Sequence, residues 1–327
     1  MVQCWGITGG SAGMAAQALA MADMLGLSMQ MKNIQIRKPW VWLPNYCYTK
    51  GLDRLVMPYA IERGSESLDA PWPDLVISCG RRGAIAALGL KAHLRHKGWK
   101  QTRFIHIQDP HIDPRYFDLV VAMEHDKITG PNVLKTRFAL HRITAHSLAA
   151  AEVRFSTWFS DYPRPQLAVL IGGSTNKYTL TQERMRVVID ELQRIVYKTP
   201  CSLLITPSRR TGADNIALLH QMFDPEPRVY IYDFDGENPY MGMLALADGV
   251  MVTNDSVNMM TDAHATGKPL YLLNLPDHHN TKPSRFAQKL LDDGIARIFE
   301  NQLEFWQYRT NNEMDKLAAD IKRVMKL

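Results

Sequence analysis

A short apolar run that breaks into a Gly-Gly-Ser loop and continues into a helical pattern occurs twice in this chain. The first run covers residues 2–8 and the second covers residues 167–171. The loops that follow are Gly9, Gly10 and Ser11 in the first copy and Gly172, Gly173 and Ser174 in the second. A strand, a glycine loop and a helix in this order are typical of a parallel α/β sheet. Two copies in one chain predict two such domains.

The second loop has the composition of a phosphate-binding loop. N–H groups at the start of the following helix suit an anion, and glycines let a ligand approach the backbone closely. Ser174 and Thr175 add donors, Asn176 adds an amide, and Lys177 sits where the charge of a diphosphate would fall. Taken alone, the loop fits a tight turn before a helix equally well.

A dinucleotide-binding dehydrogenase is the first alternative, and the spacing argues against it. The glycines of the first copy fall at positions 6, 9, 10 and 13, which is not the G-x-G-x-x-G pattern. The second predicted strand, residues 29–36, ends in Arg37 and Lys38 with no acidic residue for a ribose hydroxyl. We therefore do not expect NAD.

Length and composition set the broad class. The 327 residues fit two domains, and no apolar run approaches the roughly 18 residues that span a bilayer. The start of the sequence has no leader pattern, so we expect a cytoplasmic protein without a transmembrane segment. A net charge of +5 favours anionic partners, but the sequence has no basic, aromatic-interleaved motif that predicts nucleic-acid binding. The four cysteines are scattered, which predicts reduced thiols and no structural zinc or other metal site.

Polar side chains follow several predicted strands of the first half. Gly80, Arg81 and Arg82 follow the strand at 74–79, and two arginines at a helix start predict a bound anion or a nearby carboxylate. Asp109 and His111 follow the strand at 103–107, and His125 and Asp126 follow the strand at 117–122. A solvated turn explains any one of these groups. Together they favour a site, because ligands bind at the carboxyl ends of parallel strands.

The aromatic segment at residues 39–46 has two interpretations. Trp40, Trp42 and Tyr46 lie near Arg37 and Lys38, so the segment could touch an anionic membrane peripherally. The same rings could instead pack under a long connection, as aromatic side chains do in ordinary cores.

We expect the first domain to cover residues 1–160 and a stiff Pro-containing linker to cover 161–165. The second domain is expected at 166–310. Its strands at 202–206, 229–232, 249–252 and 269–273 alternate with helical patterns, which predicts a doubly wound parallel sheet. An amphipathic helix at 311–327 is expected to pack across both domains.

Five further motifs complete a family pattern. They are Gly130 to Val133, Thr206 to Thr211, Glu237 to Tyr240, Thr253 to Met259 and Ala265 to Pro269. With them, nearly the whole chain resembles the mitochondrial-fission "elongated mitochondria" family, whose bacterial members are regarded as predicted glycosyltransferases. More loosely, the chain resembles GT-B glycosyltransferases such as the lipid II-forming N-acetylglucosaminyltransferase.

The resemblance implies two Rossmann-like domains facing a cleft and a metal-independent glycosyltransferase with no cofactor besides its nucleotide-sugar donor. Backbone amides, helix starts and basic side chains would stabilise the leaving diphosphate. The expected acceptor is a cell-envelope glycan or glycolipid, which would place the protein in the cytoplasm or peripherally on the inner membrane. Two alternatives stay open: a non-catalytic adaptor of the same fold that recruits a partner to a membrane, and a nucleotide-sugar epimerase.

The resemblance also implies which residues carry the reaction. The donor side is expected to be Gly172, Gly173, Ser174, Asn176, Ser208, Arg209, Arg210, Asp255, Ser256, Asn258 and Asp262, with Asp262 in place of the acidic residue that holds a ribose or sugar hydroxyl. The acceptor side is expected to be Gly9, Gly10, Ser11, Gly80 and Arg81. An inverting transferase needs a base in the first domain, and we favour Asp109 over His125 because Asp109 follows its strand directly and precedes a rigid proline. A retaining transferase would not need such a base.

Overall fold

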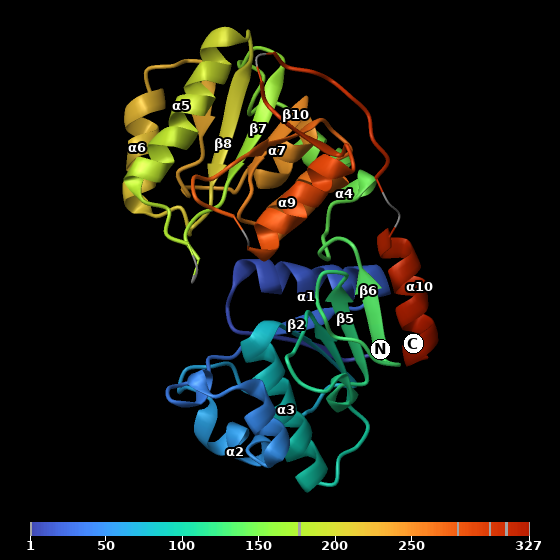
Figure 1. The fold of residues 1–327 in the computed structure, drawn as a ribbon. Coiled ribbons are helices and arrows are strands. Elements are labelled where there is room, and N and C mark those ends of the chain that lie inside the picture. Colours follow the sequence, from blue (N-terminus) through green and yellow to red (C-terminus); the bar gives the residue numbers. More distant parts are fainter. Residues whose placement is uncertain (1, 176–177, 280, 301, 311–312, 327) are drawn as a thin grey trace. The chain divides into compact units, whose positions relative to one another are not determined.

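The computed structural model describes residues 2–175, 178–279, 281–300, 302–310 and 313–326 (Figure 1). The chain divides into two compact units. Unit 1 consists of Met1–Arg142 with Asn312–Leu327, and unit 2 consists of Ile143–Asn311.

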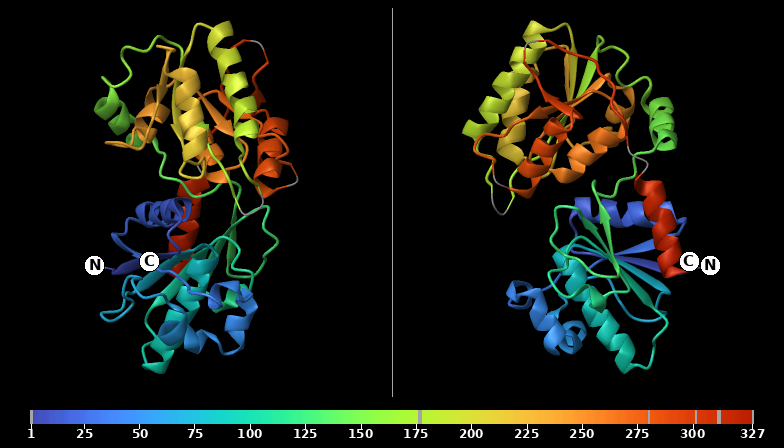
Figure 2. Two further views of the ribbon diagram at one scale, coloured as in Figure 1. Left: turned by 90° about the vertical axis from the view of Figure 1, so that its left-hand side faces the viewer. Right: turned by 45° about the vertical axis from the view of Figure 1, so that its right-hand side comes forward.

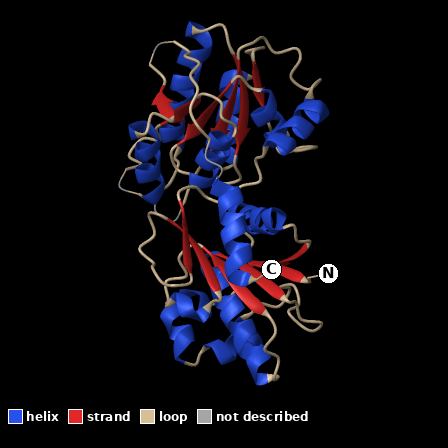
Figure 3. Cartoon of the chain, turned by 90° about the vertical axis from the view of Figure 1, so that its right-hand side faces the viewer, coloured by secondary structure: helices blue, strands red, loops and turns tan. Residues whose placement is uncertain are grey.

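Within its described residues, unit 1 contains a six-stranded parallel sheet in the order β2-β1-β3-β4-β5-β6. Its strands are β1 (Cys4–Thr8), β2 (Met29–Asn33), β3 (Leu75–Cys79), β4 (Arg103–Ile107), β5 (Leu119–Met123) and β6 (Val133–Thr136). Its helices are α1 (Ala12–Leu25), α2 (Asp53–Leu55), α3 (Gly80–His96) and α10 (Glu313–Met325), with shorter turns η1 (Trp40–Trp42), η2 (Asn45–Lys50), η3 (Val56–Ala60) and η4 (Pro114–Tyr116). The inner strands are apolar runs because helices cover the sheet on both faces (Figure 3).

The described part of unit 2 contains a second six-stranded parallel sheet, in the order β12-β11-β10-β7-β8-β9. Its strands are β7 (Gln166–Ile171), β8 (Ser202–Pro207), β9 (Val229–Ile231), β10 (Gly249–Thr253), β11 (Leu270–Leu273) and β12 (Ala296–Ile298). Its helices are α4 (Ala145–Phe155), α5 (Gln182–Lys198), α6 (Ala213–Phe223), α7 (Tyr240–Leu246), α8 (Val257–Ala265) and α9 (Lys282–Asp292). This confirms the predicted fold class of doubly wound α/β domains.

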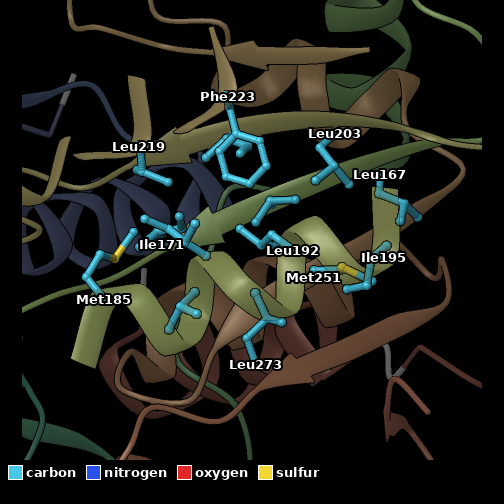
Figure 4. Close-up of a cluster of buried hydrophobic side chains, with 14 of the residues drawn as sticks. Leu167, Ile171, Met185, Leu192, Ile195, Leu203, Leu219, Phe223, Met251 and Leu273 are labelled. Carbon is cyan, nitrogen blue, oxygen red and sulfur yellow. The ribbon is translucent and has the colours of Figure 1, made fainter. Parts of the chain in front are cut away.

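The core of unit 2 shows why its sheet forms. Helix α5 places Met185, Leu192 and Ile195 on one face, at the spacing of an amphipathic helix, and buries them against β7 and β8 (Figure 4). Phe223 of α6 packs into the same cluster. Leu167, Val169 and Ile171 of β7 face this cluster, and the strand is buried along its whole length.

The division between the units falls earlier than the predicted domain end at residue 160. Helix α4 packs against α7 of unit 2, and a side chain at Gly242 would collide with Phe155. The expected linker at 161–165 also belongs to unit 2, because Pro163 accepts a hydrogen bond from Ser202 Oγ (2.8 Å) and Arg164 pairs with Asp248 (2.5 Å). The boundary and the linker predicted from the sequence are thus corrected to the step between residues 142 and 143.

The C-terminal helix returns to unit 1, as the views in Figure 2 show. Helix α10 contacts α1 and β6. It buries Leu317, Ile321 and Met325 in the hydrophobic core that α1 forms with the sheet. The carboxylate of Glu313 accepts hydrogen bonds from the N–H groups of Arg137 (2.6 Å) and Phe138 (3.2 Å). The helix is therefore part of the fold of unit 1, whereas the sequence predicted a helix packed across both domains.

Across the described ranges of the chain, the structure contains no helix that is both long enough and apolar enough to span a membrane.

Candidate functional site

The sheet of unit 2 has a topological switch point between β7 and β10. From β7 the chain proceeds outward to β8 and β9, and from β10 it proceeds the opposite way to β11 and β12. Open α/β sheets bind ligands beside such a point, outside the carboxyl ends of the strands. Loops from β7, β8 and β10 meet there, which brings together predicted donor-side residues that lie up to 82 positions apart in the chain.

Asp255 is the centre of this edge. Its carboxylate is fully buried and accepts hydrogen bonds from the Gly173 N–H (2.9 Å) and from Thr253 Oγ1 (2.7 Å). Arg210 Nη2 lies 3.1 Å from the same carboxylate. Thr253 in turn accepts the Gly172 N–H (2.8 Å). A buried carboxylate needs such donors to offset its lost hydration, so Asp255 fixes the ends of β7 and β10 and the loop after β8 together.

The glycine loop differs from the predicted phosphate cradle. The N–H groups of Gly172, Gly173 and Ser174 donate to Thr253, Asp255 and the Arg210 carbonyl, respectively. These three donors are therefore already used by neighbouring loops of the protein. A Cβ on Gly172 would lie 2.0 Å from Asp255 Oδ1, and one on Gly173 would lie 2.1 Å from the Arg210 carbonyl oxygen. The two glycines are thus required for close packing of three strand ends. Asn176 and Lys177 lie outside the described residues.

The helix after this loop also begins later than a phosphate loop requires. Helix α5 starts at Gln182 behind the N-cap Thr181. The Ser174 side chain is already engaged just before that N-cap, because its Oγ accepts the Leu180 N–H (3.0 Å). The anion-binding capacity of this edge therefore depends on side chains more than on the amides of the loop.

Arg210 is the cation that this arrangement holds at the surface. Its guanidinium pairs with Asp255 and donates to the carbonyl oxygens of Gly173 (3.1 Å) and Ser174 (3.4 Å), yet its side chain is 39% exposed. Ser208 supports the same loop by donating to the Gly172 carbonyl (3.0 Å) and accepting the Arg210 N–H (3.2 Å). Arg209 is exposed beside it. A cation with a fixed position and free surface is suited to an anionic ligand.

Helix α8 contributes the remaining donor-side residues. Ser256 caps it by accepting the Met259 N–H (3.4 Å), and Asn258 lies in its first turn. Asp262, further along α8, is partly buried and accepts a hydrogen bond from Tyr240 Oη (2.8 Å). Burial raises the pKa of Asp262 to about 7, and burial raises the pKa of Tyr240 as well. Asp262 is therefore a carboxyl that titrates near neutrality and is already held by the start of α7.

Sequence reasoning missed two residues at this edge. Thr253 links Gly172 to Asp255. The signal in the sequence was its hydroxyl, which lies two positions before the Asp255 carboxylate at the end of a strand. His278, in the loop after β11, is buried with its ring 4.9 Å from that of Tyr178, and its Nδ1 has no hydrogen-bond partner among the residues that the structure describes. Burial lowers the pKa of His278, so the ring stays neutral at physiological pH.

In unit 1 the switch point lies between β1 and β3, where Gly9 faces Arg82 near the start of α3 and Gly10 faces Asn33 and Gln35 at the end of β2. Gly80 has a φ of +73°, and a Cβ there would lie 2.2 Å from the sulfur of Met14. Ser11 precedes α1 without making a side-chain cap. The predicted acceptor-side residues thus lie at the carboxyl edge of this sheet, beside its switch point.

The two arginines at the start of α3 bind neutral oxygen atoms. Arg81 donates to the Leu43 carbonyl (2.7 Å) and to Asn45 Oδ1 (3.2 Å), and Arg82 donates to Gln35 Oε1 (3.0 Å). The carboxylate that the sequence suggested as one explanation is not among these contacts. Both guanidinium groups lie at the carboxyl edge of the sheet.

Asp109 follows β4 in a strained turn. Gln108 (φ 81°) and His111 (φ 56°) on either side of it adopt the left-handed conformation that non-glycine residues rarely adopt. Asp109 Oδ1 accepts the His111 N–H (2.7 Å), and His111 Nδ1 lies 3.5 Å from Oδ2. The buried Asn45 donates to the Pro110 carbonyl (2.7 Å) and so joins this turn to Arg81.

His125 follows the neighbouring strand β5. Its Nε2 lies 3.7 Å from Asp126 Oδ1, and Asp126 is buried and accepts the Met123 N–H (3.3 Å). Asp126 therefore has a structural role at the end of β5. Asp109 is one strand nearer to the switch point than His125.

Comparison with known proteins identifies relatives of the whole chain. A family model described as mitochondrial fission ELM1 matches residues 12–325. The mitochondrial fission protein ELM1 of Arabidopsis thaliana is 28% identical over 277 residues, which cover 77% of this chain and 64% of that protein. The chain therefore spans less than two thirds of the length of that relative. An uncharacterized protein, RP120, of Rickettsia prowazekii is 28% identical over 300 residues, which cover 78% of this chain and 80% of that protein.

Among solved structures, the chain is similar to the UDP-GlcNAc 2-epimerase of Methanocaldococcus jannaschii in complex with UDP-GlcNAc and UDP. The TM-score is 0.55 at 11% identity, covering 99% of each chain. At this identity the likeness establishes the fold alone, and that fold is the predicted GT-B class of two Rossmann-like domains.

Proposed function

This chain belongs to the mitochondrial fission ELM1 family, and we propose that it is a glycosyltransferase. It moves a sugar from a nucleotide-sugar donor to a glycan or glycolipid acceptor of the cell envelope, and it acts in the cytoplasm. The observation that carries this proposal is Arg210, a partly exposed cation that buried Asp255 fixes at the switch point of unit 2.

The donor diphosphate binds at this edge. Arg210 offers a planar fork to phosphate oxygens, and Arg209 adds a second charge beside it. The start of α8 contributes the positive end of its dipole and the side chains of Ser256 and Asn258. Asp262 and Tyr240 hold the ribose or sugar hydroxyls. This set neutralises a diphosphate leaving group with protein charges, so the proposed reaction is metal-independent.

The acceptor binds at the corresponding edge of unit 1, near Gly9, Gly10, Ser11, Gly80 and Arg81. Its hydroxyl oxygen attacks the anomeric carbon of the donor sugar and forms the new glycosidic bond. The bond from that carbon to the diphosphate oxygen breaks, and the electron pair leaves with the nucleotide. Asp109 takes the hydroxyl proton, and the strained turn held by Asn45 and His111 keeps its carboxylate at the strand end.

Two other functions fit the same fold. A nucleotide-sugar epimerase is favoured by the likeness to the M. jannaschii epimerase, which was solved in complex with UDP-GlcNAc and UDP. A non-catalytic adaptor at a membrane is favoured by the name of the Arabidopsis relative. The first would convert donor without an acceptor, and the second would consume no donor.

The test is product analysis with labelled UDP-, GDP-, ADP- and CMP-sugars, with and without a bacterial envelope lipid extract. The proposal predicts free nucleotide and labelled lipid or glycan only when the extract is present, and a loss of product in Arg210→Ala. As a matched control, Arg228→Ala removes an arginine from the opposite end of the sheet of unit 2, where it pairs with Glu226. Conversion of the sugar without extract would instead establish an epimerase, and unchanged donors in every reaction would reject both enzymes.

A further inference from the structure

The segment at residues 37–50 of unit 1 has one side anchored in the core and the other side free. Tyr48 is completely buried and its hydroxyl donates to the Trp40 carbonyl (2.5 Å). Trp40, Val41 and Leu43 pack against the core of unit 1. These contacts hold η1 and η2 in a defined conformation, so the outward side chains project from a rigid support.

Two aromatic rings face outward from this support. Trp42 is 66% exposed and Tyr46 is 54% exposed. Trp40 and Tyr48 follow the core-packing interpretation of this segment, whereas Trp42 and Tyr46 do not. Apolar burial therefore does not explain why the segment carries these two rings.

A lysine accompanies each exposed ring. Lys38 Nζ lies 5.4 Å from the centroid of Trp42, and Lys50 Nζ lies 5.7 Å from that of Tyr46. Residues 37–50 contain Arg37, Lys38 and Lys50 and no Asp or Glu. The segment thus combines aromatic rings that favour a membrane interface with an uninterrupted positive charge that favours anionic headgroups.

The segment is also bound to the edge of unit 1 that carries Asp109. Arg81 donates to the Leu43 carbonyl (2.7 Å), and Asn45 donates to the Pro110 carbonyl (2.7 Å). A surface that holds the segment therefore lies beside the strand ends of this unit.

We propose that the outward face formed by Lys38, Trp42, Tyr46 and Lys50 docks the protein on an anionic lipid bilayer. The rings insert at the level of the headgroups while the ammonium groups contact lipid phosphates. Where it concerns the acceptor, the inference rests on the proposed function: docking there brings a lipid-linked acceptor to the edge that holds Asp109.

The test is flotation with protein-free vesicles of phosphatidylcholine and phosphatidylglycerol at a ratio of about 7:3, with pure phosphatidylcholine vesicles for comparison. At low salt, the wild-type protein is retained on the anionic vesicles, and about 0.5 M salt releases it. Replacing both lysines in Lys38→Gln/Lys50→Gln weakens partitioning by about 25-fold, or about fivefold for each charge. Trp42→Ala/Tyr46→Ala weakens it by about tenfold or more.

Matched controls distinguish binding through this face from non-specific binding to the vesicles. Tyr197→Ala removes a 65% exposed ring from α5 of unit 2, and Lys97→Gln removes an exposed charge at the end of α3. Both controls bind like the wild type. Equal losses in the controls, equal retention on neutral vesicles, or no retention of the wild type at low salt would each overturn the proposal.

The vesicles contain neither nucleotide nor acceptor, so their retention of the protein does not depend on the proposed reaction. Calorimetry of the Trp42→Ala/Tyr46→Ala protein with nucleotides, in the absence of vesicles, gives wild-type affinity if the two properties are separate. A failure of flotation with intact nucleotide binding would reject the docking face alone.

Discussion

At the residue scale, Asp255 connects three loops through one carboxylate. Asp255→Asn keeps the shape of the side chain but removes the charge that holds Arg210. We expect it to lower the free energy of unfolding by roughly 2 kcal/mol, because a buried arginine contact and one strong hydrogen bond are lost. Denaturant unfolding measures this change. The control Asp224→Asn, which affects an exposed pair with His220, should change stability little, and an equal effect would contradict the central role of Asp255.

Asp262 makes stability depend on pH. Its pKa of about 7 exceeds the ordinary value of 3.8, so between these values the folded chain binds a proton that the unfolded chain has released. Stability from this group is therefore complete below about pH 4 and is lost as the pH rises through 7. At pH 8, Asp262→Asn should have a higher melting temperature than the wild type, by about 2–4 °C for each kcal/mol gained. At pH 4 the two proteins should have the same melting temperature. An equal difference at both pH values would contradict the assignment.

Substitutions at Asp109 and His125 distinguish between the two candidates for the catalytic base. If Asp109 takes the acceptor proton, Asp109→Asn lowers kcat by about a hundredfold or more and leaves donor binding intact, while His125→Ala has a small effect. Turnover assays and donor calorimetry on both variants measure this. Full activity in Asp109→Asn would exclude it as the base, and loss of donor binding would assign it a structural role.

The sequence predicted which residues meet at the edge of unit 2 better than it predicted what they do. Arg210 and Asp255 could be located because each follows an apolar strand of a parallel sheet. The role of Gly172 could not be predicted, because the Asp255 carboxylate that fills the space beside it is 83 positions away in the chain. Asn45, which holds the turn of Asp109, was missed for the same reason.

At the element scale, the loop after β7 should tolerate no side chain at Gly172. Gly172→Ala places a Cβ 2.0 Å from Asp255 Oδ1, so the loop or the carboxylate must move. We expect a loss of about 1–3 kcal/mol in stability and a weaker nucleotide affinity. In the control Gly249→Ala, at the other end of β10, the nearest atom is the flexible tip of Leu167 at 3.1 Å. Similar losses in both variants, measured by unfolding and calorimetry, would contradict this account.

The inner strands were predictable because strands buried on both faces are continuous apolar runs. The short strands β6 and β12 were missed. Each ends one sheet, and each carries a charged residue, Lys135 or Arg297, that interrupts its apolar pattern. The aromatic segment forms the short turns η1 and η2, and its alternation of buried and exposed rings could not be told from the sequence.

At the scale of the whole molecule, α10 joins the end of the chain to the core of unit 1. Ile321 is fully buried there, so Ile321→Ala should cost about 2–4 kcal/mol. Val324, in the same helix, is 44% exposed, and Val324→Ala should cost far less. Hydrogen exchange should show faster exchange in β1 and β3 of the Ile321 variant and unchanged protection in β7 and β8. Equal loosening of both units would contradict the assignment of α10 to unit 1.

The number of domains followed from the repeated strand and glycine loop, but the boundary did not. Proline residues at 161–165 are typical of a linker, and the packing of α4 on α7 together with the contacts of Pro163 and Arg164 places them inside unit 2. The amphipathic pattern of α10 likewise predicts that the helix covers a surface without identifying which one.

The central claim is that Arg210 and the switch point of unit 2 bind a nucleotide diphosphate, and calorimetry tests it most directly. UDP, GDP, ADP and CMP are titrated into the wild type, Arg210→Ala and the control Arg228→Ala. We predict that at least one diphosphate binds the wild type and Arg228→Ala with equal affinity. Its affinity for Arg210→Ala should be about tenfold to a hundredfold weaker, the value of a charged hydrogen bond. Absence of binding at millimolar concentration, or equal binding to all three proteins, would contradict the account.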